Sequence, residues 1–100
     1  MKFQVIVLSE AEQDLDNAFI WYELKQIGLG DNFFKTVNNS IKNISDNQAG
    51  YIEIYKNVRR FVIEKFPYGI YDRVNFRKKE IRIIGVIHFK RNVTILKKRI

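Results

Sequence analysis

Arginine side chains and a single histidine are the groups in this 100-residue sequence that could act on a phosphodiester. Metal-free RNA cleavage requires a base for the 2′-hydroxyl, an acid for the leaving oxygen and cations that stabilise the charged transition state. The candidate bases are Glu64, Asp72 and His88, and His88, with an unperturbed pKa of about 6.5, could serve as either acid or base. The candidate cations are Arg59, Arg60, Arg73, Arg82 and Arg91.

His88 and two tyrosines of the same region also have structural interpretations. His88 stands where a strand is expected to end, and there it could instead hold the C-terminal segment by hydrogen bonds. Tyr68 and Tyr71 lie close together around an expected turn, so they could stack on a nucleobase. We favour core packing for both tyrosines, with their hydroxyls in water.

Arg59 and Arg60 are neighbours beside an expected strand, and successive side chains of a strand point to opposite faces. Only one of them can therefore face a binding groove. The other is expected to pair with an acidic side chain of the first helix, Asp14 or Asp16. Such a surface ion pair would add less than about 1 kcal/mol to stability.

The positive charge is concentrated in the second half of the chain. The formal net charge is +7. Residues 1–50 carry 4 basic and 7 acidic side chains, whereas residues 51–100 carry 14 basic and 4 acidic ones. This asymmetry predicts one face that binds a polyanion or an acidic protein; the alternative is a lysine-rich surface that is merely solvated.

Length and composition predict one globular domain, residues 1–100. The hydrophobic fraction of 46% is typical of a folded chain, and a chain of this length has no room for a second core. With no cysteine and one histidine, we expect no disulfide, metal or cofactor. The apolar run at residues 3–8 is too short for a signal sequence or a membrane span, and we expect a cytoplasmic protein with no membrane partner.

The first half of the chain predicts a strand and two helices. Phe3 to Leu8 is rich in valine and isoleucine, as strands are. Ser9 and Glu12 have the spacing of a capping box, which predicts the start of a helix. A second helix is expected from Asp31, as its N-cap, to about Asp46-Asn47, and the short connection makes the pair an antiparallel hairpin. The core-facing stripes are Ala11, Leu15, Ala18, Phe19 and Tyr22, then Phe33, Phe34, Val37, Ile41 and Ile44.

Several side chains of the first helix fall outside its apolar stripe. Trp21 could pack at the margin of the stripe or be exposed for a partner, and we favour packing. The acidic side chains are expected to be solvated; they are Glu10, Asp14, Asp16 and Glu23.

The second half predicts three strands, at residues 60–66, 70–75 and 81–89. Two short turns join them, Pro67-Tyr68-Gly69 and residues 77–79, which predicts antiparallel pairing. An extended piece at residues 51–55 is either an edge strand or an aromatic surface. The last strand is expected to be central and buried on both faces. One face should carry Ile81, Ile83 and Ile87, and the other Arg82, Ile84, Val86 and His88.

This order of elements predicts an α+β fold. In it, an N-terminal strand precedes an antiparallel two-helix hairpin that packs on one face of a twisted, mostly antiparallel sheet. The basic end of the chain, residues 91–100, could add a short strand or a helical turn.

Four segments stand in order along the chain. They are Ala11-Glu12-Gln13-Asp14-Leu15 leading toward Tyr22; Val58-Arg59-Arg60; Phe66-Pro67-Tyr68-Gly69-Ile70-Tyr71; and Val86-Ile87-His88 followed by Lys90, Arg91 and Arg99. Together they resemble the RelE/ParE superfamily of bacterial type II toxins, also called plasmid stabilisation proteins. The resemblance implies that superfamily's fold and a small toxin that a cognate antitoxin neutralises in a hetero-oligomer. Antitoxin segments of this kind are usually acidic, and a basic groove flanked by strand edges would bind one by ion pairing and strand addition.

The superfamily has two activities: RelE-like toxins cut mRNA on the ribosome, and ParE-like toxins poison DNA gyrase. The Phe66-Pro67-Tyr68 segment and His88 resemble the ParE-like branch. The nuclease branch tends to have an arginine where this chain has Gly69 and a tyrosine where it has Lys97. The ParE-like tail, in turn, usually has a proline and a tryptophan before its last arginine. This chain has Val93 and Leu96 there instead.

The resemblance therefore implies a gyrase inhibitor that catalyses no reaction. The alternative is a ribosome-dependent mRNA endonuclease that uses Arg59 or Arg60, His88 and Arg91. A plain nucleic-acid-binding module also fits the charge, although the sequence has no helix-turn-helix pattern and no aromatic RNA-binding signature. The residues expected to bind the antitoxin or the target are Arg59, Arg60, Tyr68, Tyr71, Arg73, Arg82, His88, Lys90, Arg91 and Arg99.

Overall fold

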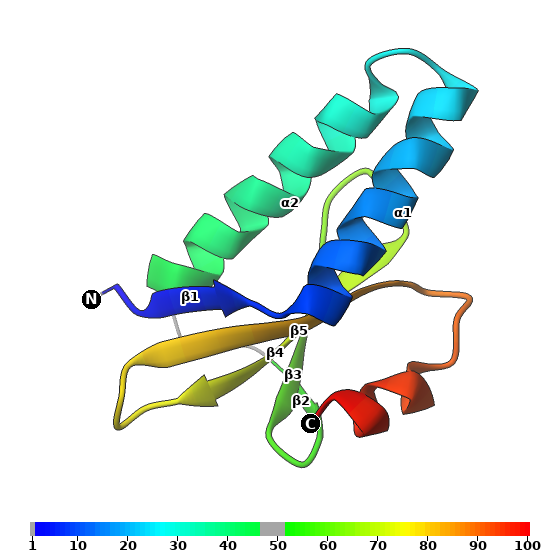
Figure 1. The fold of residues 1–100 in the computed structure, drawn as a ribbon. Helices are drawn as coiled ribbons and strands as arrows, with labels where there is room; N and C mark the ends of the chain where they lie inside the picture. Colours follow the sequence, from blue (N-terminus) through cyan, green and yellow to red (C-terminus); the bar gives the residue numbers. More distant parts are fainter. Residues whose placement is uncertain (1, 47–51) are drawn as a thin grey trace.

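The computed structural model describes residues 2–46 and 52–100 and has three layers (Figure 1). Helices α1 and α2 lie side by side as an antiparallel hairpin over one face of a sheet, and a short 3₁₀ helix, η1, covers part of the other face. The elements are β1 (Gln4–Val7), α1 (Ser9–Lys25), α2 (Leu29–Asp46), β2 (Ile52–Tyr55), β3 (Val58–Val62), β4 (Tyr68–Asn75), β5 (Glu80–His88) and η1 (Val93–Arg99). The expected α+β fold is confirmed.

The five strands form one sheet in the order β1-β5-β4-β3-β2. β1 pairs with β5 in parallel and the other neighbours are antiparallel, so the sheet is mostly antiparallel, as expected. β2 is an edge strand, which decides between the two interpretations of this segment; Tyr51, like Asn47, lies outside the described residues. β5 is an interior strand, as expected, but the central strand is β4, which has two strands on each side of it.

The strands begin earlier than the sequence pattern suggested. β3 starts at Val58, and β4 starts at Tyr68, so Tyr68 and Gly69 are strand residues and not turn residues. Tyr68 pairs with His88, and Gly69 pairs with residues on both sides. Pro67 has no N–H to donate to a ladder, so the strand starts directly after it.

A β-bulge changes which side chains of β5 face the helices. Tyr71 pairs with Gly85 but the next residue of β4 pairs with Ile83, so Ile84 is an extra residue in β5. Each bulge of this kind shifts the alternation of side chains by one position. The expected grouping is therefore wrong. Ile81, Ile83 and Val86 pack under the helices, Ile84 and Ile87 pack under η1, and His88 and Arg82 lie on opposite faces.

Two apolar cores result, one on each face of the sheet. Under the helices, Tyr22, Phe33, Phe66 and Tyr68 form a cluster of rings with centroids 5.0–6.1 Å apart. Under η1, Tyr71 is 1% exposed and packs with Val58, Ile84, Ile87 and Leu96. Tyr68 and Tyr71 thus lie on opposite faces of β4. The expectation that they lie close together is wrong.

The helix caps also differ from the prediction. The residue before α1 is Leu8, an apolar side chain that cannot cap, and Ser9 is already helical. At the start of α2, Glu23 Oε1 accepts hydrogen bonds from the N–H groups of Gly28 at 3.0 Å and Gly30 at 2.8 Å. A carboxylate is stabilised at a helix N-terminus by the exposed N–H groups and the helix dipole. Glu23, from α1, therefore caps the N-terminus of α2, which was the role expected of Asp31.

Replacing Gly30 by alanine is expected to cost about 1–3 kcal/mol of stability, because α1 and α2 cross closely at this residue. An added Cβ would lie 2.6 Å from Cγ of Glu23 and 2.8 Å from the backbone oxygen of Phe19. Urea unfolding measures the loss. Asn39→Ala, on the exposed side of α2, is the matched control and should be neutral or slightly stabilising; equal effects of the two changes would contradict the close crossing.

Candidate functional site

One groove brings together Tyr68, His88 and Arg91, which were among the residues expected to bind a partner. It lies between α1 and the adjoining ends of β4 and β5 and has a volume of about 360 Å³. The residues that line this His88 groove are Asp14, Asn17, Ala18, Trp21, Tyr68, Val86, His88 and Arg91. The β-bulge is what turns His88 toward the helices and so into this groove.

His88 has both a structural contact and a side directed to the groove. Its Nδ1 accepts a hydrogen bond from the backbone N–H of Lys90 at 3.0 Å, which holds the turn after β5. Its ring meets Tyr68 edge-on, with centroids 5.1 Å apart. Because Nδ1 is an acceptor, neutral His88 carries its proton on Nε2, the nitrogen that a ligand would meet.

The Tyr68 hydroxyl is a hydrogen-bond donor in the groove and not a base. Burial raises its pKa above the ordinary value, Tyr22 and Asp14 raise it further, and Arg91 opposes them. Tyr68 therefore stays protonated at neutral pH. Arg91 lines the same groove as His88 and supplies a positive charge there.

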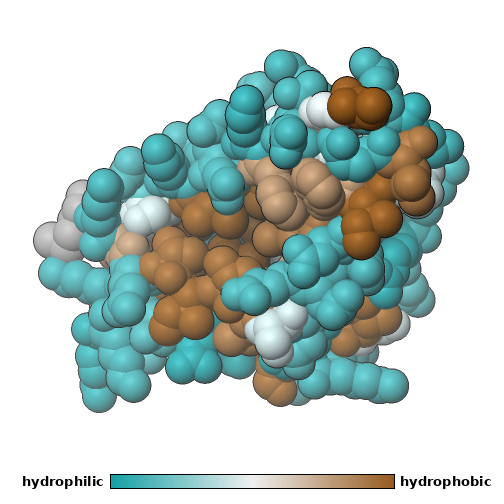
Figure 2. Space-filling model, turned by 45° about the horizontal axis from the view of Figure 1, so that its top comes forward, coloured by the Kyte–Doolittle hydropathy of each residue, from teal (hydrophilic) through white to brown (hydrophobic). Residues whose placement is uncertain are grey.

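Trp21 opens the groove onto an exposed apolar ridge on α1. The expectation that Trp21 is packed is wrong: it is 54% exposed, and its ring contacts the edge of Tyr22 and the ammonium of Lys25. Ile20, Leu24 and Ile27 are exposed along the same part of the chain. Figure 2 shows hydrophobic surface gathered over the hairpin face and its tip, within a hydrophilic rim. Contiguous apolar surface of this kind is typical of a protein-binding face.

Arg59 is held inside the protein by Asp72. Its Nε and Nη2 donate to Oδ1 and Oδ2 of Asp72 at 2.9 and 2.8 Å, a bidentate pair. Arg59 pairs with Asp72 across strands β3 and β4, so the expected partner on α1 is wrong. Burial raises the pKa of Asp72 above its ordinary value, and the Arg59 guanidinium partly offsets this. Asp72, one of the candidate bases, is fully buried.

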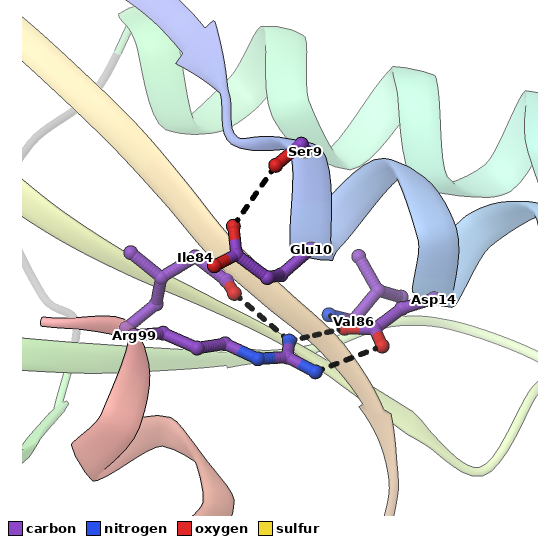
Figure 3. Close-up of polar contacts among 6 residues, drawn as sticks. All are labelled: Ser9, Glu10, Asp14, Ile84, Val86 and Arg99. Atoms are coloured by element: carbon purple, nitrogen blue, oxygen red, sulfur yellow. Dashed lines mark hydrogen bonds and ion pairs between the residues drawn. The ribbon is translucent and has the colours of Figure 1, made fainter.

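Arg99 likewise forms an ion pair within the protein, with Asp14 (Figure 3). Asp14 was expected to be solvated, but it is buried and accepts from Arg99 Nη1 at 2.6 Å and Nη2 at 3.2 Å. Asp14 also accepts from the N–H of Val86 at 3.0 Å, and Arg99 donates to the carbonyl of Ile84 at 3.0 Å. Both backbone groups lie just beyond Ile83, where pairing with β1 ends. We call these four residues the bulge lock, because they satisfy the backbone around the bulge.

No family model and no curated protein match the sequence. Among solved structures, a chain of the chromosomal ParDE toxin–antitoxin system from P. aeruginosa matches with a TM-score of 0.74 at 22% identity, covering 87% of this chain and 96% of that one. The chain has a RelE/ParE-like fold. A chain of the RelBE2 toxin–antitoxin complex from Mycobacterium tuberculosis matches with a TM-score of 0.53 at 14% identity, covering 88% and 92%.

The RelE/ParE-like fold separates the residues that the nuclease alternative requires. His88 and Arg91 share the His88 groove, Arg59 is internal, and Arg60 lies on the opposite face of β3. Arg60 lines a second groove, the η1 groove, beside the edge strand β2. Its lining is Ile54, Tyr55, Val58, Arg60, Val93, Thr94, Leu96 and Lys97.

The remaining expected residues of the RelE/ParE-like fold lie elsewhere. Lys90 adjoins His88 in the turn, Tyr71 is buried under η1, and Arg73 and Arg82 lie together at the far end of β4 and β5. Within residues 2–46 and 52–100, no three His, Asp or Glu side chains converge as metal ligands. In the same part of the chain, no helix has the length and apolar character needed to cross a membrane.

Proposed function

We propose that this chain is the toxin of a type II toxin–antitoxin system, of the ParE-like kind. In this proposal it acts in the cytoplasm by binding and inhibiting DNA gyrase, and a cognate antitoxin neutralises it in a hetero-oligomeric complex. The observation that carries the proposal is the fold shared with a chain of a ParDE system over nearly the full length of both chains.

The chemistry of the His88 groove supports a binding role. Tyr68 is protonated, Asp14 is engaged in the bulge lock, and Arg59 lies in the core. Trp21 and the apolar ridge beside it give the groove a surface suited to another protein. A protein target such as gyrase fits this surface.

The η1 groove supports an acidic antitoxin segment as the partner. The backbone of β2 forms the edge of the sheet next to it, so an extended segment can add there as a further strand. Arg60 and Lys97 line the groove and would pair with acidic side chains of that segment. Its apolar floor, which includes Val58 and Leu96, would receive the alternate side chains.

A second candidate function, ribosome-dependent mRNA cleavage, has one observation in its favour. His88 and Arg91 lie in one groove, and they are a proton-transfer group and a cation of the kinds that RNA cleavage uses. In this alternative, His88 would act as acid or base through Nε2, and Arg91 would stabilise the phosphorane.

A supercoiling assay with purified DNA gyrase tests the proposal. We expect micromolar toxin to inhibit supercoiling, and the antitoxin to restore it. The parallel assay mixes the toxin with translating ribosomes and maps mRNA ends. An absence of gyrase inhibition together with ribosome-dependent cuts would reverse the order of the two functions.

His88→Asn separates the two functions within one site. Asparagine can accept the same N–H of Lys90 and keep the turn, but its amide cannot act as a general acid or base. As a gyrase inhibitor the variant should keep its potency within a few fold, whereas a nuclease should lose about 100-fold or more of its cleavage rate. Arg91→Gln should weaken either activity. The control is Lys42→Gln, at an exposed position of α2, which should change neither.

A further inference from the structure

A third groove, at the far end of the sheet from His88, is lined in part by basic side chains. It lies at the β4–β5 hairpin beside the turn between β2 and β3 and has a volume of about 440 Å³. We call it the hairpin groove. Its lining is Asn57, Arg73, Val74, Asn75, Phe76, Lys78, Glu80 and Arg82.

Positive charge surrounds the hairpin groove. The adjoining turns add exposed cations at Lys56, Arg77 and Lys79. The acidic residue of the lining, Glu80, pairs with Arg82 at 3.0 Å. Acidic side chains instead gather on α1, on the other side of the sheet, so the molecule has a basic and an acidic side. Such a field attracts a polyanion to the hairpin groove.

The backbone around the hairpin groove cannot accept a further strand. β4 pairs with β3 and β5, and β5 pairs with β1 and β4, so both strands are interior. A ligand therefore meets side-chain tips, and Arg73 and Arg82 stand side by side as a cross-strand pair. Guanidinium groups bind phosphate oxygens with paired hydrogen bonds, which suits a phosphate backbone better than an acidic peptide that adds as a strand.

The aromatic side chains near this groove favour a duplex over a single strand. Single-strand binding relies on open rings on which bases stack. Phe76 is 64% exposed, but its ring meets Phe3 of the helix-side core edge-on, with centroids 5.9 Å apart. The ring of Tyr55, on the adjoining strand β2, is already contacted by the ammonium groups of Lys56 and Lys97, at 5.6 and 5.0 Å. The hairpin groove thus offers three cations, Arg73, Lys78 and Arg82, beside one exposed ring, which favours binding by charge over binding by stacking.

We propose that the hairpin groove binds the phosphate backbone of double-stranded DNA without reading its base sequence. This binding site goes beyond the gyrase-inhibiting and antitoxin-binding surfaces. Only the choice of DNA over RNA rests on the function proposed above, because gyrase acts on duplex DNA. The affinity of the groove for phosphates rests on its own geometry.

Fluorescence anisotropy with labelled duplex DNA tests the proposal on the purified full chain. We expect the binding constant to fall steeply with salt, as for a protein that neutralises several phosphates. In Arg73→Gln/Lys78→Gln, the salt slope should fall by about two units and affinity by about tenfold or more. The control Lys35→Gln/Lys42→Gln removes the same charge from α2 and should change affinity less than about threefold. Equal losses in both variants would overturn the proposal.

Competing ligands complete the test. Duplexes of unrelated sequence should bind equally well, and single-stranded DNA, duplex RNA and polyglutamate should bind more weakly. Tighter binding of any of these three would overturn the assignment to duplex DNA. Thermal melting of both variants checks that they fold. Arg73→Lys, which keeps the charge, should retain most of the salt slope of the wild type. If the purified chain binds duplex DNA but does not inhibit gyrase, the proposed function is refuted and the DNA-binding site is not.

Discussion

Arg59→Met is expected to destabilise the protein by about 3–5 kcal/mol at pH 8, because it leaves the Asp72 carboxylate buried and unpaired. Asp72 is fully buried, and both its oxygens accept hydrogen bonds from Arg59. Without the guanidinium, the charged carboxylate is left in the core with its desolvation cost uncompensated. Urea unfolding followed by circular dichroism measures the change.

The pH dependence of the Arg59→Met variant has a definite sign. Burial raises the pKa of Asp72 above its unfolded value, and Arg59 lowers it; without Arg59 the folded-state pKa rises further. Between the unfolded and folded pKa values, the folded state binds more protons than the unfolded state, so stability falls as pH rises. The variant should therefore recover part of its lost stability on acidification from pH 8 to pH 5, as the carboxyl becomes neutral.

Two controls isolate the buried charge. Arg60→Met changes the same residue type one position away but on the exposed side of β3, and should cost less than about 1 kcal/mol. The double variant Arg59→Met/Asp72→Leu removes both charges and should be much closer to the wild type than Arg59→Met alone. A double variant as unstable as the single one would show that packing, and not the unpaired charge, explains the loss.

Asp14→Ala is expected to be the next most damaging change, at about 3 kcal/mol. It removes the acceptor of the Val86 N–H and leaves Arg99 without its carboxylate partner. Because Arg99 is the last residue of η1, we also expect η1 to detach more often from the sheet. Trypsin should then cleave faster after Lys97 and Lys98, and the Val86 amide should exchange faster with solvent.

The comparison variant for the bulge lock is Asp16→Ala, an exposed acid two residues further along α1. It should lose less than about 0.5 kcal/mol and leave tryptic cleavage unchanged. Arg99→Gln should resemble Asp14→Ala in its cleavage pattern, since it breaks the same contact from the other side. If only Asp14→Ala accelerated cleavage, the lock would not depend on Arg99.

The order of elements was predictable because each follows from local periodicity. Three- and four-residue spacing predicted both helices, and their stripes are buried where expected, as at Ala18 and Val37. Short connections predicted the helix hairpin and the antiparallel strands. Helix caps were predicted less well because the carboxylate that caps α2, Glu23, comes from another helix.

The faces of β5 were not predictable from alternation. The run from Ile83 to Ile87 is apolar on both sides because both faces of the sheet are covered, so its pattern contains no sign of an extra residue. The bulge appears only when β5 pairs with β4. It puts His88 on the face of β5 opposite to Arg82, so that His88 lies on the helix side, in the groove with Tyr68.

By itself, the sequence determined the fold class, the segregation of positive charge in the second half, and the residue types from which a binding site could be built. Only the tertiary structure decided which charges are free to act. Arg99 is paired with Asp14, 85 residues away, and Arg59 is paired with Asp72, so neither faces a partner directly. The physical reason is that strand register and long-range packing assign each charge a partner, and residue types along one strand do not encode that assignment.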